Sequence, residues 1–226
     1  MARAATTLLA LLAALVASGA GAAAAHAAAT LKTDTRCYQE TQEVVVSGSG
    51  FAPWSVVTIS RDGTLLGSTS TDASGAFRNK FDTPELPRDV RERLYAISAT
   101  DAANTTAQTS YRATRIFASF RPRSGNPSTL KVRFSIHGFG LVQRRAPVYL
   151  HYVRPNGKPA RTIRLGTATG VCGVIARTRE RRLFAFEPSK GTWILQFDTR
   201  RKYERATSKR RTPWVRKPVQ IFSRSR

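Results

Sequence analysis

The sequence predicts an all-β protein that consists of two tandem antiparallel β-sandwiches after a signal peptide. Three observations support this fold class. Short runs rich in β-branched residues recur about every ten residues, turn signals separate them, and segments with a helical period are scarce. The length of 226 residues and the hydrophobic fraction of 41% suffice for one or two domains with buried cores.

Residues 1–29 have the organisation of a secretory signal peptide. Arg3 gives a basic start, residues 7–16 form the apolar segment, and Ala25-His26-Ala27 and Ala27-Ala28-Ala29 are small-x-small cleavage sites. An uncleaved anchor is the alternative, because the apolar stretch approaches the ~20 residues that span a bilayer. We expect a secreted or cell-surface protein that contacts the membrane only through this segment before cleavage.

Residues 30–118 are expected to form the first sandwich. The expected strands cover residues 43–47, 55–60, 64–70, 76–81, 93–99 and 109–117. Asp62-Gly63 lies between two of them and predicts a tight hairpin, because glycine accepts a positive φ. Residues 72–75 predict another turn, and residues 87–93 have room for one helical turn. A cluster of Pro, Gly, Ser and Asn at residues 119–128 predicts the linker.

Residues 129–226 are expected to form a second, strongly basic sandwich. Its expected strands cover residues 130–136, 148–153, 162–166, 182–186 and 192–197. Five landmarks recur in both halves in the same order: Gly50-Phe51 with Gly138-Phe139, Asp62-Gly63 with Asn156-Gly157, Leu66-Gly67 with Leu165-Gly166, Gly75 with Gly173, and Tyr95-Ala96-Ile97 with Trp193-Ile194-Leu195. This order indicates a diverged internal duplication. The alternative is that any two sandwiches share turn residues at strand spacing.

The basic charge is concentrated in the second half of the chain. The formal net charge is +23, and residues 30–110 carry −2 whereas residues 111–226 carry +24. Such asymmetry favours an anionic partner for the second half. Outside the cytoplasm, chromosomal DNA is not the default partner.

The first half contains four distinctive segments, which are residues 45–53, Asp62-Gly63, Leu66-Gly67 and residues 72–77. Together they resemble bacterial immunoglobulin-like modules of exported surface proteins. The resemblance covers residues 40–117 and implies a seven-stranded immunoglobulin-like sandwich that serves as a spacer, stalk or adhesive unit. The remainder resembles a group of exported bacterial two-domain proteins, through residues 125–127, 148–157 and 191–198. That resemblance implies a fold and a compartment, and it carries over no catalytic residue.

Two cysteines follow the signal peptide, Cys37 and Cys172. An even count in an exported chain favours a disulfide, which here would join the two domains. Closing a loop of this length contributes about 4–5 kcal/mol in the chain-entropy model. Two buried free thiols and an intermolecular bridge are the alternatives.

The sequence contains no constellation typical of a catalytic or metal site, so no cofactor is expected. His151 lies in an expected strand and His137 beside a turn, and both are interpreted as structural. Glu187 and Asp198 are the candidates for a glycosidase pair in a half that is poor in carboxylates. A secreted hydrolase is therefore the least favoured function class.

The basic surface is the functional candidate. The candidate binding residues are Arg177, Arg179, Arg181, Arg182, Arg200, Arg201, Lys202, Arg205, Lys209, Arg210 and Arg211, with the interleaved aromatic residues Tyr203 and Trp214. Arginine binds phosphate and carboxylate bidentately, and aromatic rings stack on sugars or bases.

The sequence thus predicts a non-enzymatic exported module whose second domain binds an anionic envelope polymer or polysaccharide. Nucleic acid is a further polyanion that such a surface accepts. The main alternative is a passive spacer or adhesion module without a ligand, whose many arginines reflect codon bias.

Overall fold

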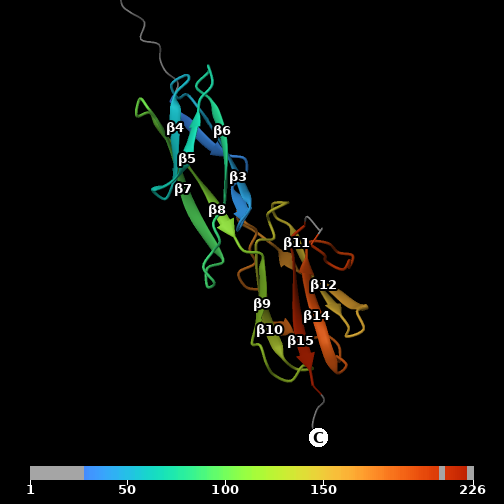
Figure 1. The fold of residues 1–226 in the computed structure, drawn as a ribbon. Helices are drawn as coiled ribbons and strands as arrows, with labels where there is room; N and C mark the ends of the chain where they lie inside the picture. The colour runs from blue at the N-terminus through green and yellow to red at the C-terminus, as the bar shows by residue number, and fades with distance from the viewer. Residues whose placement is uncertain (1–27, 209–211, 223–226) are drawn as a thin grey trace, which may run out of the picture.

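In the computed structural model, which describes residues 28–208 and 212–222, the chain folds into two β-sandwiches placed end to end (Figure 1). The regular secondary structure of these residues is all β-strand, which confirms the predicted fold class. The expected signal peptide lies outside them apart from its last two residues. In the described part of the chain, no helix is long and apolar enough to cross a membrane.

The first sandwich packs the sheet β1-β3-β6 against the sheet β2-β8-β7-β4-β5. Its strands are β1 (Thr30–Thr33), β2 (Cys37–Gln39), β3 (Glu43–Ser49), β4 (Val56–Arg61), β5 (Thr64–Ser70), β6 (Phe77–Asp82), β7 (Glu92–Asp101) and β8 (Thr106–Thr114). Tyr95, Ile97 and Ala99 alternate along β7 and are buried, because alternate residues of a strand face the same side. They pack with Ile59 of β4 and Tyr38 of β2 in one core.

The second sandwich packs the sheet β13-β10-β9 against the sheet β12-β11-β14-β15. Its strands are β9 (Phe117–Arg121), β10 (Lys131–His137), β11 (Pro147–Val153), β12 (Pro159–Thr167), β13 (Arg181–Arg182), β14 (Gly191–Asp198) and β15 (Trp214–Ile221). Phe134, Leu150, Trp193 and Phe197 belong to its core. Of the expected strand 182–186, only Arg182 pairs with β10 in the ladder, together with Arg181 just before it. Leu183 is buried, and its N–H still donates to the Leu130 carbonyl.

The two sandwiches follow the same plan. β3 lies between β1 and β6 as β10 lies between β9 and β13, and β5-β4-β7-β8 corresponds to β12-β11-β14-β15. Gly67 (φ 154°) and Gly166 (φ 156°) follow Leu66 and Leu165, each of which is the extra residue of a β-bulge in the corresponding hairpin. The repeat that the sequence indicates is thus present in the strand order and in the backbone.

Local turn signals are realised as expected in the first sandwich. Asp62 (φ 48°) and Gly63 (φ 81°) form the two-residue loop that joins β4 to β5, which confirms the predicted hairpin. The segment expected to hold one helical turn forms a turn closed by the Val90 N–H and the Pro87 carbonyl, without helix.

The connection between the sandwiches is shorter than the expected linker. β8 ends at Thr114, and β9 begins at Phe117 and pairs with β10 in the second sandwich. Arg115 and Ile116 therefore connect the two units. Residues 119–128 contain the end of β9 and the loop that leads to β10, so their Pro- and Gly-rich composition indicates a loop within the second sandwich.

A disulfide and an ion pair fix this junction. Cys37 of β2 is bonded to Cys172, with a Cα–Cα distance of 5.3 Å, which confirms the predicted interdomain bridge. Arg115 donates from Nε and Nη2 to the two carboxylate oxygens of Glu40, both at 2.7 Å, and from Nη2 to the Leu86 carbonyl at 2.6 Å. The bidentate Arg115 contact holds the pKa of Glu40 below its ordinary value despite partial burial.

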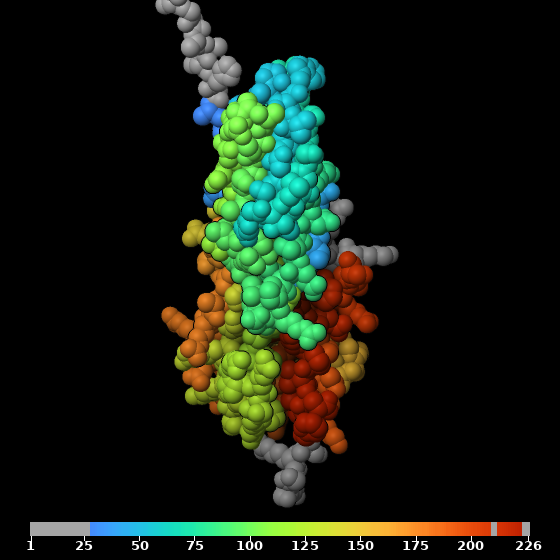
Figure 2. Space-filling view, turned by 60° about the vertical axis from the view of Figure 1, so that its left-hand side comes forward, coloured from blue at the N-terminus to red at the C-terminus, as the bar shows by residue number. Residues whose placement is uncertain are grey.

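The connection between β6 and β7 adds a third contact across the junction. Its Arg91 guanidinium lies over the Phe117 ring of β9 at 4.1 Å, and Lys217 of β15 approaches the same ring at 5.3 Å. In Figure 2 this connection, coloured green, lies over the upper parts of β9 and β15. The two sandwiches therefore form one elongated body with a constrained junction.

Candidate binding surface

The predicted basic residues lie on the second sandwich in two separate segments. The first segment leads into and forms β13, and the second connects β14 to β15. The described members are Arg177, Arg179, Arg181, Arg182, Arg200, Arg201, Lys202 and Arg205, all exposed except the half-buried Arg181. Lys209, Arg210 and Arg211 lie outside the described residues.

A hollow on the sheet β13-β10-β9 gathers arginines from three segments. Arg121, Arg123, Arg133 and Arg177 line a depression of about 670 Å³, and Glu180 is the carboxylate among its described lining residues. Glu180 approaches Arg133 at 3.9 Å, with both side chains largely exposed. We call this depression the arginine hollow. It combines Arg177 from the sequence prediction with three arginines that the prediction missed.

Strand register places two of these arginines opposite each other. Arg121 of β9 and Arg133 of β10 are direct cross-strand partners. Like charges directly opposite each other destabilise a sheet, so this pair has an electrostatic cost unless an anion lies between or above the guanidinium groups. The spacing of 12 residues between them across an irregular loop gives no signal in the sequence; only the register reveals it.

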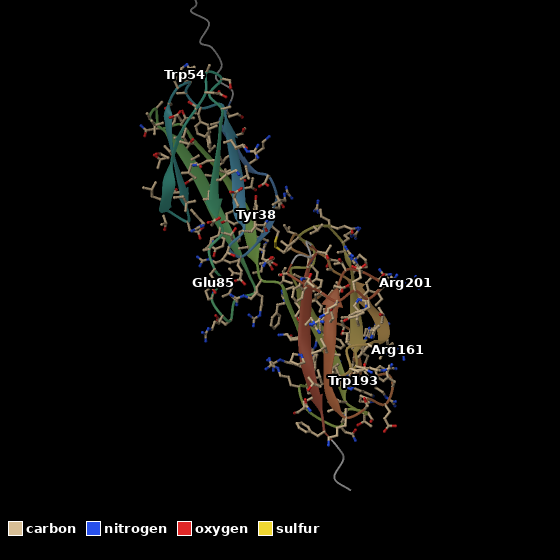
Figure 3. The ribbon with its side chains drawn as sticks, turned by 45° about the vertical axis from the view of Figure 1, so that its right-hand side comes forward. Tyr38, Trp54, Glu85, Arg161, Trp193 and Arg201 are labelled. Atoms are coloured by element: carbon tan, nitrogen blue, oxygen red, sulfur yellow. A yellow bond between two sulfur atoms is a disulfide. The ribbon has the colours of Figure 1, made fainter. Side chains whose placement is uncertain are left out.

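A second basic area lies on the flank formed by β12 and the β14–β15 connection. Arg181 donates to the Arg164 carbonyl at 3.4 Å and Arg161 to the Ala185 carbonyl at 3.4 Å, which ties the β13 segment to β12. Figure 3 shows Arg161 and Arg201 on this same side of the second sandwich. We call it the basic flank. The sequence prediction missed Arg161 and Arg164, which occupy a strand and belong to no charge run.

A buried polar network holds the β14–β15 connection against the sheet. His151 of β11 is fully buried, and its Nε2 contacts Asp198 Oδ1 at 3.2 Å and the Arg200 carbonyl at 3.1 Å. Because a carbonyl can only accept, Nε2 carries the proton, and in the neutral ring the Thr162 hydroxyl donates to Nδ1 at 2.7 Å. His151 is thus structural, as interpreted from the sequence, with partners at both ring nitrogens.

Gln196 completes the network from β14. Its amide nitrogen donates to Asp198 Oδ2 at 2.9 Å and to the Glu204 carbonyl at 2.7 Å, and its oxygen accepts from the Ala206 N–H at 3.1 Å. Burial alone would raise the pKa of Asp198, but hydrogen bonds, including those from His151 and Gln196, hold the pKa below its ordinary value. The basic side chains of this connection therefore project from a well-anchored backbone.

The two aromatic candidates have different surroundings. The Tyr203 ring meets the His151 ring edge-on at 5.5 Å between centroids and is half-buried, so it packs on the polar network. Trp214 begins β15 opposite Asp198 and lines a groove at the junction of the two sandwiches. Tyr203 is not among the described residues that line the Trp214 groove.

Glu187 and Asp198, the candidates for a glycosidase pair, have different surroundings. Asp198 is fully buried in the network, whereas Glu187 is exposed in the connection before β14. His137 is half-buried at the end of β10, and burial lowers its pKa. Among the described residues, no three His, Cys, Asp or Glu side chains are grouped as metal ligands would be.

Comparison with known proteins gives likenesses among solved structures alone. No family model matches the chain, and no curated protein matches it. The CARDB domain of a Pyrococcus furiosus protein, crystallised with di-metal ions, is 19% identical over 39% of this chain and 92% of that domain, with a TM-score of 0.29. The tetra-tandem repeat of the extending region of a large adhesion protein is 11% identical over 86% of this chain and 49% of that chain, with a TM-score of 0.29.

Trypsin-activated alpha-2-macroglobulin from Escherichia coli is a further match. It is 12% identical over 76% of this chain and 14% of its own length, with a TM-score of 0.29. The immunoglobulin-like sandwich architecture of the present chain rests on its own strand pairing, described above.

Proposed function

We propose that this chain is a non-enzymatic exported module whose second sandwich binds an anionic polymer of the cell envelope. The observation that carries the proposal is the arginine hollow, where Arg121 and Arg133 face each other across two strands beside Arg123 and Arg177. Four planar guanidinium groups in one depression suit phosphate or carboxylate groups of a polymer. The basic flank offers further contacts along the same sandwich.

Two features support export. The N-terminal sequence has the organisation of a signal peptide. The Cys37–Cys172 disulfide is of the kind that persists in oxidising compartments. Outside the cytoplasm, phosphate-rich and acidic polysaccharides are the abundant polyanions that such a surface meets.

The test uses the full mature chain and a poly(glycerol phosphate) polymer of the teichoic type. We expect binding at low salt and a steep loss of affinity as salt rises, because bound counterions are released from the polymer. The triple variant R121S/R133S/R177S should bind at least tenfold more weakly and with a smaller salt slope. The matched control K32S/R78S/R88S removes the same charge from exposed positions on the first sandwich.

Equal weakening in both triple variants would assign the binding to net charge and overturn the proposed site. Tighter, salt-dependent binding of single-stranded DNA than of poly(glycerol phosphate) would identify nucleic acid as the better ligand. Absence of polymer binding at low salt would remove the binding function altogether.

A rigid spacer is the second candidate function, and the junction favours it. Two connecting residues, a disulfide and the Arg115–Glu40 pair constrain the sandwiches relative to each other. A spacer of fixed length needs this stiffness and no ligand. Small-angle scattering that shows a single elongated shape for the wild type, together with no polymer binding, would favour the spacer.

A further inference from the structure

A groove at the junction of the sandwiches has a chemistry that differs from the arginine hollow. It measures about 580 Å³, within the range of roughly 300–1,000 Å³ typical of ligand pockets. The first sandwich contributes Gln39 and Gln42 beside the start of β3. The second contributes Val142 from the β10–β11 connection and Trp214 from β15. Figure 1 shows the β10–β11 connection and the start of β15 at the base of the first sandwich.

The groove has an apolar wall and neutral polar groups. Trp214, Val142 and Leu141 belong to the wall, and the Val142 side chain is 65% exposed. Gln39 and Gln42 provide amide groups, and because the Gln42 Oε1 already accepts the Gln39 N–H at 2.8 Å, Gln42 offers chiefly its Nε2 donor to a ligand. None of the described lining residues is charged. An aromatic ring beside amide groups suits a ligand with apolar ring faces and many hydroxyl groups, as a pyranose has.

Two segments with basic side chains adjoin the groove. A smaller adjoining hollow of about 240 Å³ shares Leu141 and Val142 and adds the guanidinium-bearing Arg36 and Arg144. The β14–β15 connection carries the arginines of the basic flank and reaches the groove at Ser208. A ligand in the groove therefore meets neutral groups in the described lining and has basic side chains nearby.

We infer that this groove binds an acidic oligosaccharide, with one pyranose ring against Trp214, its hydroxyls at Gln39 and Gln42, and carboxylates of neighbouring units at Arg36 and Arg144. The inference rests on the proposed function for the anionic character of the ligand and adds its sugar component. The groove selects ligands that contain pyranose rings, whereas the arginine hollow selects ligands by their negative charge alone. Both sandwiches supply the site, which gives the constrained junction a role in binding.

The test compares two polyanions that differ in their rings. Oligogalacturonide carries one carboxylate on each pyranose, and inorganic polyphosphate carries charge without rings. We expect W214A to weaken oligogalacturonide binding about tenfold, as loss of one stacking contact does, and to leave polyphosphate binding unchanged. W54A is the matched control, because Trp54 is 76% exposed on the distal end of the first sandwich (Figure 3). W214F should retain most of the affinity.

A second variant avoids dependence on the fold around Trp214. V142E places a carboxylate in the groove at an exposed position and should weaken oligogalacturonide binding about tenfold by repulsion. V56E is its control, because Val56 is 55% exposed on β4 of the first sandwich. Thermal unfolding of each variant identifies any change in stability that accompanies the change in binding.

The outcomes separate this inference from the proposed function. If W214A and V142E leave oligogalacturonide affinity unchanged, or weaken the binding of both probes equally, the groove is not a sugar site. The arginine hollow is then tested separately by R121S/R133S/R177S. If R121S/R133S/R177S has no effect but W214A does, the groove stands and the hollow is wrong. A larger loss for oligothymidylate than for oligogalacturonide in W214A would assign the groove to nucleobases. A wild-type chain that binds neither probe at low salt overturns both.

Discussion

Gly75 and Gly173 occupy equivalent positions in the two sandwiches. Their φ angles are 73° and 75°, and their carbonyls accept the N–H groups of Phe51 and Phe139 at 3.2 and 3.1 Å. A Cβ at Gly75 would lie 2.0 Å from the Phe51 carbonyl oxygen, and one at Gly173 would lie 2.0 Å from the Gly140 nitrogen. Both positions therefore require glycine for its conformation and for space.

We predict that G75A and G173A each destabilise the chain severely, by more than about 2 kcal/mol, since a positive φ and a backbone clash add together. G63A and G157A are the matched controls, because each has a φ of 81° and no atom within 4 Å of the added Cβ. These controls should lose only about 1 kcal/mol. Urea denaturation measures the four values, and equal losses in all four variants would contradict the role of close packing.

The elements that the sequence predicts well are those with local causes. Asp62-Gly63 requires a hairpin because of backbone conformation alone, and alternation along β7 follows from one buried face. The Cys37–Cys172 pairing followed from cysteine arithmetic, because just two cysteines are present.

The features that escaped prediction depend on contacts between distant residues. Arg115 meets Glu40 across 75 positions, and neither residue lies in a recognisable motif. The Arg121–Arg133 pair depends on the register of β9 and β10. The linker was predicted at the wrong position because Pro and Gly indicate a loop but not which strands the loop connects. The sequence thus predicted the basic charge of the candidate site and the sandwich that carries it, but it did not predict the geometry of the site.

The disulfide should be a major contributor to stability. It closes a segment with a sequence separation of 135 residues and joins the two sandwiches. We predict that C37S/C172S lowers the free energy of unfolding by about 2–5 kcal/mol, through the larger conformational entropy of the unfolded chain. Denaturation of the variant is compared with that of the wild type with and without reductant. Reductant should destabilise the wild type alone, and an identical response of both proteins would contradict the prediction.

The Arg115–Glu40 pair should make stability depend on acidity. The contact lowers the pKa of Glu40 in the folded state, so the unfolded state binds the proton more readily. Its contribution is therefore present above the ordinary glutamate pKa of about 4.3 and is lost as the pH falls through the lower folded-state pKa. We predict that E40Q costs about 1–3 kcal/mol at pH ~7 and much less at pH ~3.

Urea denaturation at the two pH values measures the difference between E40Q and the wild type. E43Q is the control, because Glu43 forms an exposed pair with Lys80, and such pairs contribute little. A deficit of E40Q that is as large in acid as at neutral pH would show that the charge of Glu40 does not stabilise the junction.

Removal of one arginine from the cross-strand pair should have opposite effects on stability and binding. R133T replaces a guanidinium opposite Arg121 with a residue that favours strands, and both side chains are exposed. We predict a gain of several tenths of a kcal/mol in stability and weaker binding of poly(glycerol phosphate). K190T is the control, because Lys190 is exposed before β14 and outside the strands, and it should change neither property much. A loss of stability in R133T would show that the two arginines do not repel each other.

The buried network around Gln196 should control protease access to the basic β14–β15 connection. Q196L keeps the approximate size of the side chain but removes its hydrogen bonds to Asp198, Glu204 and Ala206, which anchor the backbone that follows β14. Trypsin cleaves after arginine and lysine, and Arg200, Arg201 and Lys202 lie in this connection, so we predict faster cleavage there in the folded variant. T192V is the control, because Thr192 is exposed at the other end of β14. Limited proteolysis with mass spectrometry locates the cuts, and an unchanged cleavage rate at residues 200–202 in Q196L would show that other contacts hold the connection.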